Sequence, residues 1–118
     1  MAELHSEFEA TGYIIKKTTD GITAYATGGQ ANAVALTSDI NEVSICATGG
    51  DSTKLPAAVA GMEIVVINHG IAAMDLFPAS GDYINEAAVN TATSIAINAT
   101  AICYCYADDY WEVVEVAR

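Results

Sequence analysis

The sequence predicts an all-β protein: a small antiparallel β-sandwich or barrel of short strands with an extended N-terminal arm. Three observations favour this fold. β-Branched and aromatic residues gather in short runs, and turn residues separate these runs at 49–51, 68–70 and 80–82. Helix-forming runs are brief, since Pro56 and Gly61 bracket the best of them. Short strands between recurring turn signals are typical of sandwiches and small barrels.

The strands follow from the runs themselves. We expect them, in chain order, at 33–36, 42–46, 62–68, 73–77, 93–98, 100–106 and 110–116, with weaker signals at 13–17 and 22–26. Within 100–106, the side chains of Ile102, Tyr104 and Tyr106 alternate with a set of small residues that includes Cys103 and Cys105. Because successive side chains of a strand point to opposite faces, the two sets lie on opposite sides of the sheet.

The chain length fits one domain, because domains cluster near 100–150 residues and this chain has 118. Residues 1–30 differ from the rest, with three acids before residue 10, a lysine pair at 16–17 and loop-like runs rich in Thr and Gly. We therefore divide the chain into residues 1–30, an N-terminal arm or a first hairpin, and residues 31–118, the β domain. The sequence leaves arm and hairpin equally open.

The charge balance bears on the partners. Fifteen acidic residues face four basic ones, for a net charge of −11. A phosphate backbone requires clustered Lys and Arg, so we expect no direct binding to nucleic acid. Only 16% of the residues are charged, against an average near 25%. This low charge indicates that part of the surface meets another protein chain.

Neither export nor a membrane span is expected. The stretch MAELHSEFEA has no basic n-region and no apolar core of the kind found in signal peptides. Residues 87–107 carry no charge and are long enough to span a bilayer. They contain six Asn, Thr and Ser residues and are flanked by acids, so two strands joined by a turn explain them better.

Reactive groups are few. The three cysteines are Cys46, Cys103 and Cys105, an odd number that favours buried, reduced thiols over a disulfide framework. Neither His5 nor His69 stands at a zinc-type spacing from the C-x-C pair. We expect no cofactor and no metal. The sequence does not decide whether the Asp108–Asp109 pair binds an ion, although an ordinary acidic turn is the simpler interpretation.

Motifs for catalysis are missing as well. The runs TGGQANA and ATGGDSTK are rich in glycine but lack the Gly-Lys-Ser/Thr of a P-loop. The sequence contains no G-x-S-x-G and no H-E-x-x-H motif. We therefore expect a protein that is not an enzyme.

Three segments resemble a module of tailed-bacteriophage virion proteins. They are KLPAAVAGMEIVVINHG, LFPASGDYINEAAVNTATSIAI and DDYWEVV, which together cover about residues 51–116. The shared pattern is a Leu-Pro-Ala start, a Val/Ile strand that ends in Asn, a Phe-Pro-Ala-x-Gly-Asp turn and a C-terminal strand with Trp. Residues 1–50 fall outside it.

The resemblance implies a structural role. Modules of this kind look like capsid decoration (cement) proteins, β-rich homotrimers that bind the major capsid protein on the outer surface of the shell and stabilise it. Such a protein is made in the host cytoplasm and resides on the virion. The alternative is a fibre, knob or collar domain of a phage tail that binds the host surface.

Six apolar or aromatic residues are the candidates for contacts. Leu76, Phe77 and Ile84 lie on either side of the turn in LFPASGDYIN, and Tyr104, Tyr106 and Trp111 belong to the two C-terminal strands. We interpret them as residues of the subunit interface or of the monomer core, and the sequence leaves both roles open.

Overall fold

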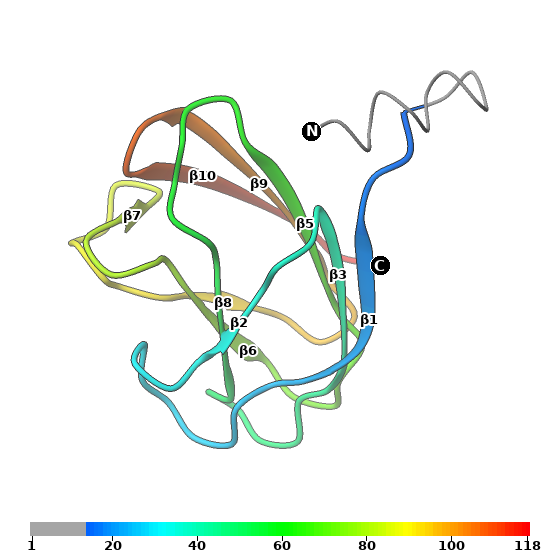
Figure 1. The fold of residues 1–118 in the computed structure, drawn as a ribbon. Helices are drawn as coiled ribbons and strands as arrows, with labels where there is room; N and C mark the ends of the chain where they lie inside the picture. Colours follow the sequence, from blue (N-terminus) through cyan, green and yellow to red (C-terminus); the bar gives the residue numbers. More distant parts are fainter. Residues whose placement is uncertain (1–13) are drawn as a thin grey trace.

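The computed structural model describes residues 14–118, and every regular element within that range is a strand (Figure 1). The strands are β1 (Thr18–Thr23), β2 (Val34–Ala35), β3 (Ile40–Ile45), β4 (Ser52–Lys54), β5 (Glu63–Asn68), β6 (Met74–Phe77), β7 (Tyr83–Ile84), β8 (Thr93–Ile95), β9 (Thr100–Ala107) and β10 (Tyr110–Val116). The prediction of an all-β protein is thus confirmed.

The first six strands alternate between two sheets. Sheet A has the order β1-β3-β5-β9-β10-β7, and sheet B has the order β2-β4-β6-β8. Strands β1, β3 and β5 pair in parallel, as do β2, β4 and β6. The chain therefore winds from one sheet to the other and back, and each turn of the path stacks on the previous one. This is a short β-solenoid of three coils (Figure 1).

The C-terminal strands close the solenoid with antiparallel pairing. In sheet A, β9 pairs with β5 on one side and with β10 on the other, so Val65 and Val114 both lie opposite Ile102. In sheet B, β8 pairs with β6. A tight turn at Asp108–Asp109 joins β9 to β10, and Asp109 adopts a positive φ of 72° there.

The prediction that the strands pair in antiparallel fashion is wrong for most of the strand pairings. Among the described residues, five of the eight strand pairings are parallel and three are antiparallel. A parallel pair needs a crossover connection, whereas an antiparallel pair can be joined by a two-residue hairpin. In the coils of this protein, the crossover is itself a strand of the other sheet. The arrangement is a solenoid rather than a clear sandwich or barrel.

Most of the expected strands are present. Strands β5, β6, β9 and β10 lie where the apolar runs predicted them, and β2, β3 and β8 are shifted or shortened by a few residues. Strands β4 and β7 were missed, and β1 lies mostly between the two weak signals, overlapping the one at 22–26 only at residues 22–23. Residues 14–17, at the weak signal of 13–17, form no strand, and residue 13 lies outside the described residues.

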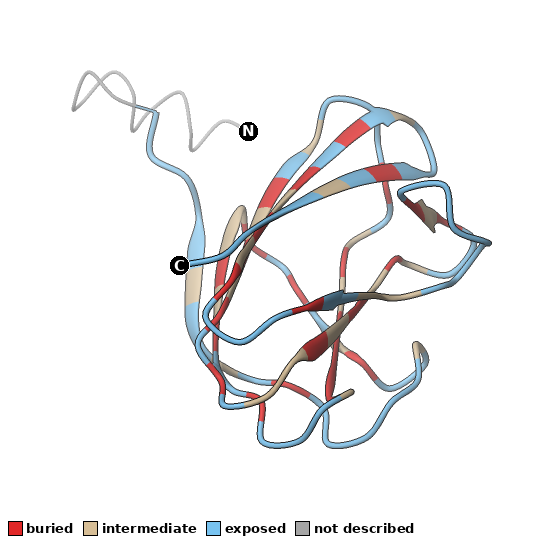
Figure 2. Ribbon diagram, turned by 180° about the vertical axis from the view of Figure 1, so that it is seen from behind, coloured by how far each residue is buried: buried red, intermediate tan, exposed pale blue. Residues whose placement is uncertain are grey.

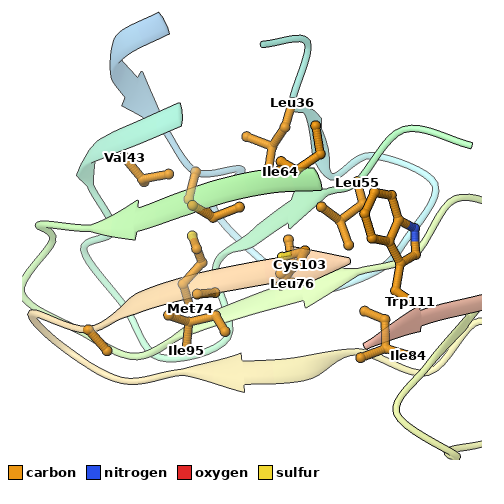
Figure 3. Packing of buried hydrophobic residues seen from close by; sticks show 14 of the residues in the cluster. Leu36, Val43, Leu55, Ile64, Met74, Leu76, Ile84, Ile95, Cys103 and Trp111 are labelled. Carbon is orange, nitrogen blue, oxygen red and sulfur yellow. The ribbon is translucent and has the colours of Figure 1, made fainter. Parts of the chain in front are cut away.

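The hydrophobic core lies between the two sheets. Figure 3 shows its packing: Leu76 and Cys103 lie near the middle, and Trp111 lies at one end beside Leu55 and Ile84. The largest buried apolar side chains are those of Leu36, Val43, Leu55, Val66, Met74, Leu76, Ile84, Ile95 and Trp111. In sheet A, the four central strands β3, β5, β9 and β10 contribute alternate residues to this core. The face of sheet A that points toward sheet B is therefore buried along these strands.

A buried asparagine, Asn68, bonds to the backbone at the end of one coil. Its side-chain nitrogen lies 3.0–3.2 Å from the carbonyl oxygens of Ala72, Ile95 and Ala96, which share its two N–H groups, and its side-chain oxygen accepts from the Gly70 N–H at 2.9 Å. Because the Asn68 side chain is fully buried, these bonds satisfy groups that would otherwise be costly to bury. Asn68 thereby ties β5 of sheet A to the end of β8 in sheet B.

The expected N-terminal arm or hairpin of residues 1–30 includes β1. This strand lies at the edge of sheet A and pairs in parallel with β3, not with a chain neighbour. Its register slips between Thr19 and Ile22, next to Gly21, which has a φ of +71°. Such a bulge at an edge strand hinders pairing with other chains. Residues 1–13 lie outside the described residues.

The uncharged stretch of residues 87–107 contains β8 and almost all of β9 rather than a helix. Across residues 14–118, the structure holds no helix that is long and apolar enough to cross a membrane.

Candidate interaction surface

The face of sheet A that points away from sheet B is unusually apolar. We call it the outer face. Its centre is a row of four side chains on four adjacent strands: Ile40, Val65, Ile102 and Val114. The registers place each of them directly opposite the next, because Ile40 pairs with Val65, Val65 with Ile102, and Ile102 with Val114. We call these four residues the apolar row.

The rows on either side differ in character. Next to the apolar row, Glu63, Tyr104 and Glu112 lie opposite one another on β5, β9 and β10. On its other side, Ile67 of β5 lies opposite Thr100 of β9. The exposed fractions of Tyr104 and Val114 are 42% and 52%, whereas Ile40, Val65 and Ile102 are half-buried between their neighbours in the sheet. Buried residues alternate with less buried ones along β9, as expected for a strand with one face on the core, whereas β10 is buried only at Trp111 and is mostly exposed toward its end (Figure 2).

The outer face departs from the usual pattern of a sheet that covers a core on one side. Such sheets alternate apolar residues inside with polar residues outside. Here the outward positions of β5 and β9 carry Val65, Ile67, Ile102 and two tyrosines. Contiguous apolar patches on the surface of a soluble protein mark sites of interaction with other molecules. The outer face is therefore the candidate functional surface.

A group of tyrosines extends this face at the β9–β10 turn. The rings of Tyr83 and Tyr110 stack with their centroids 4.8 Å apart and their planes at 12°, and the Tyr106 ring lies 5.9 Å from that of Tyr110. Parallel pairing of β7 with β10 places Tyr83 opposite Tyr110. Tyr106 is the most exposed of the three, at 66%. We call these three residues the tyrosine cluster.

Three aspartates lie around the same turn. The buried Asp82 carboxylate accepts the Ala58 N–H at 2.9 Å, and Asp108 accepts the Ala60 N–H at 2.9 Å. Burial raises the pKa of the Asp82 carboxyl; the hydrogen bond from Ala58 opposes this shift, and the nearby Asp109 adds to it. Within residues 14–118, no group of three or more potential ligands is arranged to hold a metal ion. These aspartates hold the loop at 58–60 against the turn.

At the other end of the outer face, Glu42 joins three coils. Its carboxylate accepts hydrogen bonds from the Gly21 N–H of β1 at 2.8 Å and from the Ser44 hydroxyl at 2.7 Å. His69 Nδ1, just after β5, lies 2.6 Å from the other oxygen. The Gly21 hydrogen bond, followed by those of Ser44 and His69, lowers the pKa of Glu42 to about 2.

The six residues singled out from the sequence divide into three groups by burial. Leu76, Ile84 and Trp111 are buried in the core, each with 0–1% of its surface exposed. Phe77 is partly buried at the end of β6, and Tyr104 and Tyr106 are exposed on the outer face. The structure brings Ile84 and Trp111 together, since they are partners in the β7–β10 pairing. It does not bring them together with Tyr104 or Tyr106.

The cysteines all belong to the core. Cys46, Cys103 and Cys105 are buried free thiols. Burial raises the pKa of Cys103 to about 12 and that of Cys105 to about 11, and it also raises the pKa of Cys46. Thiolates are the reactive form, so these thiols are inert in the folded protein. The interpretation of the cysteines as small apolar core residues is confirmed.

Sequence reasoning missed most of the apolar row. Ile40, Val65, Ile102 and Val114 lie far apart in the sequence, and only the register of four strands places them side by side. One signal was present: β5 is apolar at nearly every position, Ile64 to Ile67, instead of alternating with polar residues. Such runs are typical of strands covered on both faces.

The comparisons with known proteins add no relative. No protein-family model matches the chain, and neither the curated proteins nor the solved structures that were searched contain a match to it.

Proposed function

We propose that the protein is a structural component of a tailed-bacteriophage virion, namely a capsid decoration protein. In this proposal it binds the outer surface of the major capsid lattice and stabilises it. The observation that supports the proposal best is the apolar row on the outer face of sheet A, Ile40–Val65–Ile102–Val114. Apolar surface is costly to leave in water. Covering this face with another protein would stabilise the complex by about 25 cal/mol per Å² of apolar surface removed from water.

Further features fit the same role. The segments that resemble phage virion modules include β5, β6, β7, β8 and β10, which form much of both sheets. In this proposal, the two sheets act as a small sandwich-like block, residues 1–30 form an arm on the shell, and three copies form a homotrimer. The protein would be made in the host cytoplasm and reside on the capsid surface. In this proposal it has no catalytic activity, holds no cofactor, and binds neither nucleic acid nor a membrane.

Co-sedimentation tests the function directly. The purified protein is mixed with capsid particles of the phage that encodes it, stripped of this protein, and the particles are pelleted. We expect the protein in the pellet at a saturating ratio to the capsid subunits, and the decorated shells to withstand higher temperature than the bare ones. Light scattering during gel filtration, on the same sample, is expected to give three times the chain mass of 12.3 kDa. Protein that remains in the supernatant at every concentration would refute decoration.

One observation favours a second candidate, a fibre, knob or collar domain of the tail that binds the host surface. The tyrosine cluster offers stacked and exposed rings, and Tyr106 is 66% exposed. Exposed aromatic rings are common anchors in recognition sites. The test is binding of the protein to glycans purified from the host cell surface. This candidate is favoured if Tyr106→Ala abolishes the binding and Tyr25→Ala preserves it. Tyr25 is the control because it is also exposed but lies outside the cluster.

A further inference from the structure

On its four central strands, β3, β5, β9 and β10, the outer face carries charge of one sign only. These strands contain no lysine or arginine, and three of their four glutamates, Glu42, Glu63 and Glu112, lie on this face. The fourth, Glu115, alternates with them and accepts the Ala96 N–H beside β8. Two of these acids, Glu63 and Glu112, lie on either side of Tyr104 in the row next to the apolar row. Both are exposed. The apolar row is therefore bordered by negative charge.

None of the four basic residues lies on these central strands. Lys16 and Lys17 precede β1, and the Lys17 carbonyl accepts the Ile40 N–H at 3.1 Å, so this pair lies at the β1 end of the apolar row, away from Glu63 and Glu112 on β5 and β10. Lys54 belongs to β4 in sheet B. Arg118 follows β10, where its Nε donates to the Asn98 carbonyl at 3.0 Å. A second copy that packed its own Glu63–Tyr104–Glu112 row against this one would place glutamates against glutamates. Juxtaposed like charges are unfavourable in interfaces, so this pairing is opposed.

We propose that the outer face of sheet A binds a partner-protein segment with an apolar stripe bordered by lysine or arginine. The stripe covers the apolar row, and the basic residues pair with Glu63 and Glu112. The exposed ring of Tyr106 offers a further position for a cation, because ring faces attract guanidinium and ammonium groups. This inference rests on the proposed function and specifies the chemistry of the capsid surface that the protein contacts.

Two peptides serve as probes. The first is an amphipathic helical peptide with a leucine stripe bordered by lysines, and the second has the same stripe bordered by glutamates. Each carries a fluorescent dye and is titrated with the full chain, with anisotropy as the readout. We expect the lysine peptide to bind at least about tenfold more tightly than the glutamate peptide, and this preference to shrink as salt is added. Equal affinity for both peptides would overturn the proposal.

Variants locate the site. The double substitution Glu63→Lys and Glu112→Lys is expected to reverse the preference between the peptides, and Ile102→Ser to weaken binding of both. Matched controls are Glu86→Lys and Val89→Ser, which change an exposed acid and an exposed apolar residue in the loop after β7. Circular dichroism confirms that each variant is folded. If the face variants bind like the controls, the outer face is not the site.

A second copy is the competing occupant, and mass measurement distinguishes it. If Ile102→Lys converts an oligomer of the wild-type protein to a monomer, the face is a contact between copies and the proposal is wrong. Capsid co-sedimentation of the same variants distinguishes a failure of the proposed function from a failure of the proposed binding face. Wild-type protein and face variants that pellet equally with capsids would leave decoration intact and refute the role of this face. The expected peptide preferences without capsid binding would refute decoration alone.

Discussion

Trp111 fills the end of the core where β7 meets β10. Its side chain is 1% exposed and lies beside Leu55 and Ile84 (Figure 3). Its indole Nε1 has no hydrogen-bond partner within residues 14–118, so the ring contributes through apolar packing alone. At the neighbouring outward positions, Tyr106 and Tyr110 are exposed. Side chains on one side of this short strand pair therefore pack in the core, and those on the other side lie on the surface.

Trp111→Ala is expected to lower the free energy of unfolding by ~3–5 kcal/mol, because it removes a large buried side chain and leaves a cavity. Tyr106→Ala is the matched control. It removes an aromatic ring that is 66% exposed and should change stability by less than ~0.5 kcal/mol. Urea denaturation followed by circular dichroism measures both. Equal unfolding midpoints for the two variants would contradict the burial of Trp111.

Gly70 permits a close approach between two coils. A Cβ atom at this position would lie 2.5 Å from both the Cβ and the backbone nitrogen of Cys46, in the neighbouring coil. Backbone cannot move aside cheaply, so Gly70→Ala is expected to destabilise the fold by ~1–3 kcal/mol.

The control for this substitution is Gly49→Ala. A Cβ there meets nothing within 4 Å, and the substitution should be neutral or slightly stabilising. Thermal unfolding of the two variants side by side gives the comparison. A Gly70→Ala variant as stable as Gly49→Ala would show that the coils are less tightly packed than the structure has them.

At the scale of elements, Glu42 links β1, β3 and the turn after β5 through one carboxylate. Its pKa of about 2 in the folded protein lies below its ordinary value of 4.5. A depressed folded pKa stabilises the native state at pH values above the unfolded pKa, and this stabilisation is lost as the pH falls through the folded pKa. The coils are therefore joined less firmly in acid.

Glu42→Gln is expected to cost on the order of 1–3 kcal/mol at pH 7, because hydrogen bonds to a charged group are lost. The difference from wild type should be full above pH 4.5, shrink between pH 4.5 and pH 2, and vanish below pH 2. Urea denaturation across this range measures it, with Glu112→Gln, an exposed glutamate, as the control. A difference that stays constant down to pH 2 would contradict the role of ionised Glu42.

The strands were easier to predict than their partners. Periodicity along one strand is a local property, and it identified β5, β9 and β10 and the two faces of β9. Periodicity alone did not decide which face of β9 is buried, because both sets are compatible with a core. The preference of free thiols for burial correctly indicated the Cys103 face, whereas Tyr104 and Tyr106 were left open between interface and core. Strand β4 was missed because Ser52 and Thr53 are polar, yet both are fully buried between β2 and β6.

At the scale of the whole molecule, the winding of the chain could not be predicted from the sequence. Successive coils share no sequence repeat, so nothing local marks that Ile40 stacks on Thr18 or that Val65 stacks on Ile40. Residues 50–68 and 81–98 resemble each other weakly, since each runs Gly-Asp, then Ala-Ala-Val, then a β-branched strand that ends in Asn. This similarity does not correspond to coils. The first segment runs from sheet B to sheet A and the second from sheet A to sheet B, so equivalent residues lie in opposite sheets. The winding places Ile40 beside Val65, and the antiparallel strands β9 and β10 then add Ile102 and Val114 to complete the apolar row.

The placement of β9 between β5 and β10 sets an order of events during synthesis. On the ribosome, β3 and β5 are made well before β9, and domains generally fold from the N-terminal end as the chain emerges. Until β9 arrives, one edge of β5 has no neighbour in sheet A, and Ile64 and Val66 lack the cover of Ala101 and Cys103. A nascent chain paused in this interval exposes an apolar strand with one unpaired edge, and transiently exposed surface of this kind is what chaperones protect.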